Sequence, residues 1–407
     1  MHDVQKNLLR ILSDALWGNA VRHTYAESEW EDILTHAEDQ GVLFLILQSC
    51  KWIRPQLSPS NWVKWRSKLV STILHNESLM EIQKGILNRM RSVNIPCIIL
   101  KGASLAACYE NPAARALGDI DLLIPPDCVE RASDLLREYG FQAPEESYQH
   151  PYHIDYYRNG TTVELHFAVS TFPESGAGTA AARFMDSCWD NIQHKQIGDG
   201  SVPCLGDSHQ ALSLLLHMQR HMTTGCIGLR QLCDWAVFVR SVSADRFTGE
   251  ILPVLEKCGL ARFAGILTAA AVHDLGLEPE YGAWCSVVSK GSIRTMMDEI
   301  LRAGSIHNRN NTDDVSNFFV EVSGSESAMH VFWQKINALA KRKYPITKKL
   351  PILLPLYWVY IPLRYWIRSL AGKRRRKSLM RTIQMTKQRK RLYKELHLFQ
   401  VEKERAR

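Results

Sequence analysis

Two aspartates stand one residue apart inside the segment GDIDLLI, which covers residues 118–124. The apolar run that follows the pair, closed by two prolines, is typical of a short buried strand. Alternate residues of a strand point to the same face, so Asp119 and Asp121 should project together while Ile120 and Leu122 face the core. Two carboxylates side by side repel each other, so the pair calls for a cation between them.

A divalent metal ion is a suitable cation for such a pair, because hard carboxylate oxygens favour Mg²⁺ or Mn²⁺. The competing interpretation is a solvated strand edge or an acid pair at a loop end, since the motif alone is weak. A third acid, Glu164, lies between the apolar residues Val163 and Leu165 of another expected strand and should face the opposite way. Three carboxylates around two metal ions suit phosphoryl or nucleotidyl transfer.

Residues upstream of the acids suit the binding of phosphate. Lys101 and Gly102 end one apolar stretch and open a short helix, whose first N–H groups are free to bind a phosphate. Gly118 permits close approach of the backbone directly before the acid pair. The sequence therefore predicts a phosphate site beside the expected metal site.

These side chains need a scaffold of alternating strands and helices. Apolar or alternating runs predict strands at residues 95–100, 118–124 and 161–167, and helical periodicity predicts helices at 103–109 and 127–139. Such interleaving indicates an α/β or α+β core.

The rest of the chain divides around that core. Residues 1–90 form a helical N-terminal region, 91–205 the core, 206–345 a second helical domain and 346–407 an aromatic and basic tail. With 407 residues, 45% of them hydrophobic and 23% charged, the composition excludes a collagenous or wholly disordered chain.

Charge is distributed unevenly along the chain. Residues 341–407 hold 21 Lys and Arg against 3 Glu, a net of +18, whereas residues 1–340 carry a net of −10. An apolar segment with aromatic residues, 350–363, precedes the main basic cluster 373–377, and it is too short to span a bilayer. This pattern suits attachment to an anionic membrane. A buried helix followed by a solvated basic helix is the equal alternative, and nucleic acid is a weaker one.

The cysteines and the N-terminal residues indicate in which cellular compartment we expect the protein. The ten cysteines are scattered without a CxxC pair, which argues against a structural zinc site and suits a reducing compartment. The first 18 residues lack the apolar core of a signal peptide. We expect a cytoplasmic protein, peripheral on the inner face of the plasma membrane if the tail binds lipid.

Two stretches carry a family resemblance: residues 95–105, which include Leu-Lys-Gly, and RALGDIDLLI at 115–124. They closely resemble an uncharacterised bacterial nucleotidyltransferase family of the DNA polymerase β superfamily. The segment VELHF at 163–167 is similar to its acid-x-His segment, and residues 216–235 are similar to a later helical motif. The resemblance spans residues 20–240 and implies an α+β fold, with a small mixed sheet and flanking helices between helical regions.

The resemblance implies a role for each matching residue. Asp119, Asp121 and Glu164 would be the catalytic residues and the ligands of Mg²⁺ or Mn²⁺, with Glu164 as a metal ligand or general base. The implied nucleotide-binding residues are Lys101, Gly102, Arg115 and Gly118, and the implied substrate-binding residues are His166, Arg230 and Asp234.

Several of the residues around the three acids also have a simpler interpretation. Lys101 is then a solvated charge, Arg115 a member of a surface ion pair, and His166 a structural histidine that shares a face with Glu164. Arg230 and Asp234, four residues apart on a helix, would form an intrahelical ion pair. His217 and His221 have the same spacing, and for them we expect a structural or substrate-lining role.

The expected activity is metal-dependent transfer of a nucleoside monophosphate from an NTP to a hydroxyl or phosphate acceptor, with release of pyrophosphate. The acceptor would be a small molecule, a sugar, a peptide or a protein side chain. One alternative is a non-catalytic, membrane-tethered nucleotide-binding or scaffold protein, which would not need Glu164. The other is an RNA-binding protein that uses the basic tail.

Overall fold

The computed structural model describes residues 2–303, apart from 20–21, 49, 174, 198–199, 225–226 and 286–287, together with residues 337, 354–358, 360, 396 and 398. The chain forms two compact units. The first comprises Met1–Met222, Cys226–Asn308 and His397–Arg407, and the second comprises Thr223–Gly225 and Arg309–Leu396. Most of the expected tail, 346–407, lies outside the described residues. No helix in the described part of the chain has the length and apolar character needed to cross a bilayer.

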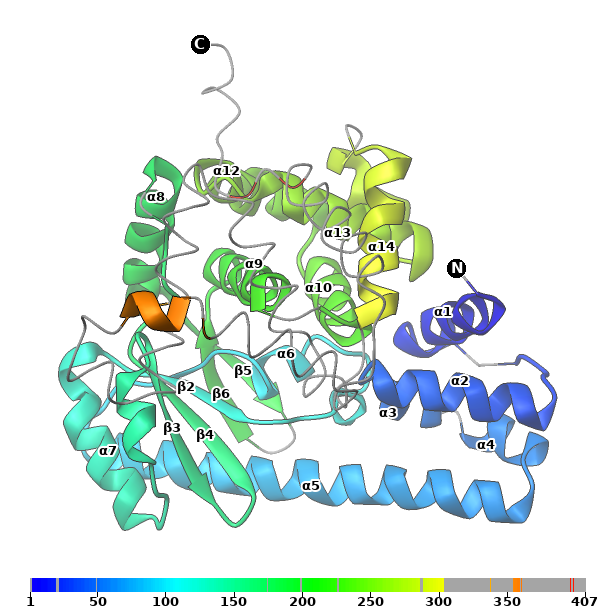
Figure 1. The fold of residues 1–407 in the computed structure, drawn as a ribbon, viewed down its shortest axis with the longest axis horizontal. Helices are drawn as coiled ribbons and strands as arrows, with labels where there is room; N and C mark the ends of the chain where they lie inside the picture. The colour runs from blue at the N-terminus through cyan, green and yellow to red at the C-terminus, as the bar shows by residue number, and fades with distance from the viewer. Residues whose placement is uncertain are drawn as a thin grey trace. The chain divides into compact units, whose positions relative to one another are not determined.

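A mixed sheet with strand order β3-β4-β2-β1-β6-β5 forms the centre of the first unit. Its strands are β1 (Ile98–Ile99), β2 (Ile120–Leu123), β3 (His153–Arg158), β4 (Thr161–His166), β5 (Ile192–Ile197) and β6 (Gly200–Leu205). Strands β2 and β4 are parallel, as are β1 and β6, and the other neighbours are antiparallel. With helices on both faces of this sheet (Figure 1), the expected α+β fold is confirmed.

Helices precede, interrupt and follow the strands. Those of the first unit, short 3-10 and π segments aside, are α1 (Asp3–Leu16), α2 (Glu27–Asp39), α3 (Leu43–Leu47), α4 (Cys50–Ile53), α5 (Pro59–Ser92), α6 (Ala103–Ala106), α7 (Val129–Glu138), α8 (Gly176–Asp186), α9 (Asp207–Thr224), α10 (Leu229–Ser241), α11 (Ala244–Arg246), α12 (Leu252–Lys257), α13 (Ala261–Asp274) and α14 (Lys290–Ala303).

The predicted strands are present with shorter bounds. Residues 95–100 were expected to form one strand, but only Ile98–Ile99 does so. Pro96 has no N–H to donate to a ladder, which limits pairing at the start of this stretch. β2 begins at Ile120, so Asp119 lies just before it, and β4 ends at His166. β3, β5 and β6 have no counterpart among the predicted strands.

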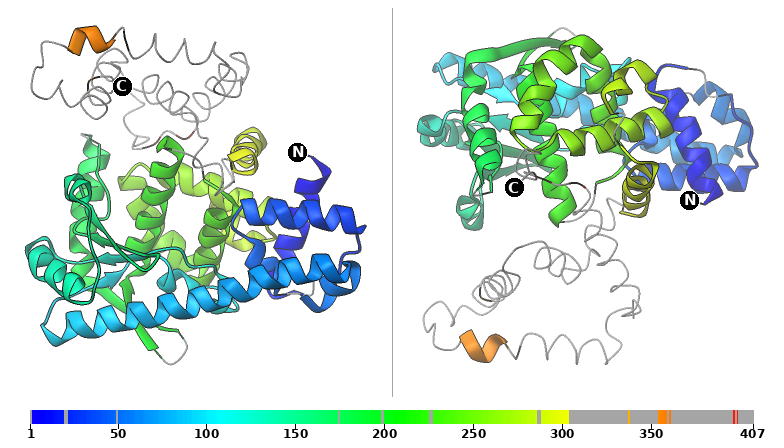
Figure 2. Two further views of the ribbon diagram at one scale, coloured as in Figure 1. Left: turned by 60° about the horizontal axis from the view of Figure 1, so that its bottom comes forward. Right: turned by 90° about the horizontal axis from the view of Figure 1, so that it is seen from above.

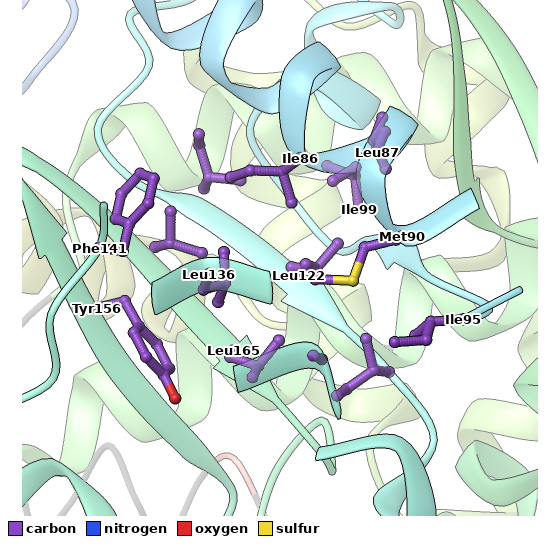
Figure 3. Packing of buried hydrophobic residues seen from close by; sticks show 14 of the residues in the cluster. Ile86, Leu87, Met90, Ile95, Ile99, Leu122, Leu136, Phe141, Tyr156 and Leu165 are labelled. Carbon is purple, nitrogen blue, oxygen red and sulfur yellow. The ribbon is translucent and has the colours of Figure 1, made fainter. Parts of the chain in front are cut away.

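One face of the sheet packs against α5 and α7. Leu122 and Leu165 contribute to this core from the sheet, Met90 from α5 and Leu136 from α7 (Figure 3). Helix α5 runs beneath the sheet, and α9 and α10 lie on its other side (Figures 1 and 2). The apolar residues of β2 and β4 therefore fix which face is left for polar side chains.

The hairpin that joins β3 to β4 turns through two residues, Asn159 and Gly160. Both have positive φ, 48° for Asn159 and 80° for Gly160. Two successive residues of this conformation are typical of the tight type I′ turn, and Asn-Gly is the sequence that forms it most readily. The register that follows pairs His153 with His166.

Candidate active site

The three expected carboxylates meet on the polar face of the sheet. Asp121 and Glu164 are register partners on the parallel strands β2 and β4. One ligand atom from each of Asp119, Asp121 and Glu164 lies within 4.8 Å of the other two. Ile120 and Leu122 are buried in the core on the opposite face, so the alternation expected from the sequence is confirmed.

The two aspartates differ in their surroundings. Asp121 is buried, with 2% of its surface exposed, and its Oδ1 lies 2.7 Å from Nζ of Lys101. Burial opposes ionisation of Asp121, but Lys101 and His166 outweigh it and hold the pKa of this carboxyl well below its ordinary value. Asp119 is exposed, and the charge of Asp121 beside it raises its pKa. Asp119 therefore gains most from an added cation.

His166 bridges the two strands that carry the acids. Its Nε2 lies 3.2 Å from Oδ1 of Asp121 and 3.1 Å from Oε2 of Glu164. Burial disfavours the imidazolium, yet hydrogen bonds to both carboxylates raise the pKa of His166. The histidine thus orients both acids, and it lies on the same face as Glu164, as expected from their two-residue spacing.

Lys101 and Gly102 follow β1 at the edge of the carboxylate cluster. Besides Asp121, Nζ of Lys101 contacts Nδ1 of His217 on α9, at 3.3 Å. Gly102 has φ +56° and ψ −112°, a conformation that favours glycine, and an added Cβ would lie 3.7 Å from the carbonyl oxygen of Asp119. An added Cβ at Gly118 would have no atom of the described residues within 4 Å of it.

Arg115 and Asp234 form a buried ion pair. Nε of Arg115 donates to Oδ1 of Asp234 at 2.7 Å and Nη2 donates to Oδ2 at 2.9 Å, while the Tyr109 hydroxyl donates to Oδ1 at 2.7 Å. Nη1 of Arg115 also lies 3.3 Å from the Gly102 carbonyl oxygen. The expectations of a surface pair for Arg115 and of a simple intrahelical pair for Asp234 are therefore corrected. Asp234 is buried on α10 and fixes the guanidinium of Arg115, which in turn contacts the Gly102 carbonyl oxygen. The ion pair therefore holds the Gly102 loop in place.

Other residues expected at the site lie on α9 and α10. The charge of Asp121 raises the pKa of Asp119, and the positive charges of Lys101 and Arg230 offset part of that rise. The rings of His217 and His221 meet edge to face with centroids 4.3 Å apart, so the shared helical face is confirmed. Burial and then Lys101 depress the pKa of His217 well below its ordinary value.

Several polar residues around the site were not singled out from the sequence. Asn76 of α5 donates to the Arg115 carbonyl oxygen at 3.0 Å and accepts from the Leu117 N–H at 2.9 Å, which fixes the segment before Asp119. Arg220 of α9 lies over the Tyr152 ring, 5.1 Å from its centroid. Arg220 follows His217 on α9 by nearly one turn, and that spacing was the available signal.

His153 and Asp155 of β3 were missed as well. His153 pairs in register with His166, and Asp155 pairs with Glu164. Both side chains therefore lie on the polar face of the sheet. Their one-residue separation is the same signal that identified Asp119 and Asp121, but it was hidden because β3 was not recognised as a strand.

The carboxylate cluster fits a hard divalent cation. Its donors are three carboxylate groups whose oxygens converge within 4.8 Å, and the repulsion that raises the pKa of Asp119 is what a bound cation would relieve. Carboxylate oxygens are the ligands that Mg²⁺ and Mn²⁺ prefer.

Comparison with known proteins supplies the family. No curated protein matches the chain. One matching solved structure is the solution structure of the antibiotic-resistance factor ANT(2'')-Ia, with 15% identity and a TM-score of 0.29, over 50% of this chain and 90% of that one. Residues 26–276 match the family described as uncharacterised nucleotidyltransferase, which is well over half of the chain. The chain therefore belongs to this family of nucleotidyltransferases.

Proposed function

We propose that this protein transfers a nucleoside monophosphate from an NTP to a hydroxyl or phosphate acceptor in a metal-dependent reaction that releases pyrophosphate. The observation that carries the proposal is the convergence of Asp119, Asp121 and Glu164 within the matched residues 26–276. Asp119, Asp121 and Glu164 would hold Mg²⁺ or Mn²⁺, which when bound neutralises phosphate charge and lowers the pKa of an acceptor hydroxyl.

The bond changes define what the protein must do. An acceptor oxygen forms a bond to the α-phosphorus of the NTP while the bond from that phosphorus to the bridging oxygen breaks, and pyrophosphate leaves with the electron pair. When the acceptor is a hydroxyl, its proton passes to the carboxylate of Glu164. Glu164 suits this role because its side chain is 19% exposed, against 1% for Asp121.

The surrounding residues position these groups. His166 holds the carboxylates of Asp121 and Glu164 through Nε2. Lys101 keeps Asp121 ionised and supplies positive charge near the triphosphate. Gly102 and Gly118 let the backbone approach the phosphates, while Arg115 and Asp234 keep the Gly102 loop in place.

Labelled nucleotides test the reaction. Purified protein is incubated with each NTP, Mg²⁺ or Mn²⁺ and cell extract, once with label in the α-phosphate and once in the γ-phosphate. We expect α-label in an acceptor and γ-label in pyrophosphate, and the labelled product identifies the base and the acceptor. Transfer of γ-label to the acceptor would instead identify a phosphotransferase and contradict the proposal.

We also propose that the protein is cytoplasmic and that residues 346–407 attach it to the anionic inner face of the plasma membrane. The charge difference between residues 1–340 and 341–407 supports this proposal. An anionic lipid is favoured over nucleic acid because most of the tail's aromatic residues precede its basic cluster.

A further inference from the structure

A second group of metal-binding side chains adjoins the carboxylate cluster and differs from it in chemistry. One ligand atom from each of His153, Glu164 and His166 lies within 4.8 Å of the other two. Glu164 belongs to both groups. The second group thus offers imidazole nitrogen where the first offers only carboxylate oxygen.

The contacts of His153 leave one ring nitrogen aimed at an acid. Nε2 lies 3.2 Å from Oδ1 of Asp155. Nδ1 lies 3.9 Å from Oε2 of Glu164 and makes no hydrogen bond to any described residue, although it is fully buried. A buried ring nitrogen without a hydrogen bond is costly, and a cation held between it and the Glu164 carboxylate would satisfy both groups.

Neighbouring rings and the strand register hold the imidazole of His153 beside that of His166. His153 and His166 are opposite each other in the β3–β4 register, with ring centroids 4.9 Å apart. His150 stacks on His153 at 3.6 Å between centroids. The contact between Asp155 and His153 is the carboxylate–histidine arrangement that fixes the orientation of metal-bound imidazoles.

We propose that His153 Nδ1, Glu164 and His166 Nε2 form a second cation site that is selective for a borderline transition metal such as Zn²⁺ or Co²⁺ over Mg²⁺. A cation bound there takes the place of the proton through which His166 Nε2 otherwise contacts the carboxylates of Asp121 and Glu164. Imidazole nitrogen favours these ions, whereas Mg²⁺ prefers oxygen donors. Three protein ligands leave a coordination position for water or a substrate oxygen. Glu164 links this site to the carboxylate cluster. The inference concerns metal binding alone and does not depend on the proposed transfer reaction.

Zinc binding to the chelator-treated, full-length protein tests the site. Calorimetric titration with Zn²⁺ in excess Mg²⁺ should show one site that His153→Gln removes. Asp155→Asn, which leaves both ring nitrogens of His153 in place, should weaken the site by about 10- to 100-fold. Asp119→Asn should leave it unchanged, because Asp119 belongs only to the carboxylate cluster.

His209→Gln is the matched control. His209 is a buried histidine of α9 that bonds the Phe184 carbonyl oxygen, away from the cluster. Equal zinc affinity in the wild type and His153→Gln, or equal losses in His153→Gln and His209→Gln, would overturn the proposal. Circular dichroism checks that each variant is folded.

X-ray absorption at the zinc edge gives a readout that needs no variant. The wild-type protein loaded with one equivalent of Zn²⁺ should show imidazole nitrogen from two histidines in the first shell. A shell of oxygen alone, or one that contains cysteine sulfur, would overturn the assignment. Failure of NTP transfer alongside nitrogen-bound zinc would contradict the proposed function and leave this site standing.

Discussion

The ammonium group of Lys101 lies 2.7 Å from Oδ1 of Asp121, and both side chains are largely buried. This contact places the ammonium group beside the buried member of the acid pair, whereas Asp119 is exposed to solvent. The pair is thus asymmetric, and each carboxylate can be tested separately.

Asp119→Asn and Asp121→Asn should each abolish NTP transfer, with a loss far greater than tenfold, because each removes a charge-neutralising ligand from the metal site. Initial rates with α-labelled NTP measure the effect. Asp127→Asn, an exposed acid six residues beyond Asp121, is the control and should retain activity. Full activity in either site variant with normal thermal melting would refute the assignment.

Glu164→Gln should separate binding from turnover. Asp119 and Asp121 remain to hold the nucleotide metal, so calorimetry with a non-hydrolysable NTP and Mg²⁺ should still detect binding, while transfer is lost. Unchanged turnover would show that Glu164 is only a strand residue.

Arg115→Ala should destabilise the fold by about 3–5 kcal/mol, because it leaves the Asp234 carboxylate buried without its cation. Urea denaturation measures the free energy of unfolding. Lys6→Ala breaks the solvent-exposed pair with Asp3 and should lower the free energy of unfolding far less. Similar losses in both variants would show that burial of the Arg115 pair adds nothing.

The buried imidazole of His209 should make the folded protein less stable in mild acid. Burial lowers its pKa below the ordinary value of 6.5, so the folded state binds a proton less readily than the unfolded chain. Stability is therefore lost as the pH falls through 6.5, and the loss levels off below the folded pKa. Between pH 8 and pH 5, the melting temperature of the wild type should decline more steeply than that of His209→Gln. Parallel curves of melting temperature against pH would contradict this prediction.

Residues 346–407 should bind anionic vesicles in a salt-dependent manner, since each Lys or Arg near such a surface contributes about 1 kcal/mol at most. Sedimentation with and without phosphatidylglycerol compares the full chain with one that ends at Tyr344. If both chains stay in the supernatant, or if the shorter one does not fold, the tail packs in the core instead.

The sequence predicted those parts of the site that follow from local alternation. The apolar residues beside Asp121 and Glu164 identified the buried face, and the acids on the other face followed from the two-residue period. The pairing of Arg115 with Asp234 could not be predicted, because the partners are 119 residues apart and no periodicity links them. His153 was missed because the polar residues of β3 do not form an apolar run.

The turn at Asn159 and Gly160 acts on the candidate sites from the opposite end of the hairpin. It adjoins the pair Arg158 and Thr161, whereas His153 and His166 form the last pair of the ladder. A one-residue change in turn length would reverse every side chain that follows. Val163 would then lie on the polar face of the sheet, and Glu164 would point into the hydrophobic core. Asn159 and Gly160 contribute no chemical group, yet they set the strand register on which the candidate active site depends. Insertions at this turn should therefore be as damaging as loss of the Glu164 carboxylate.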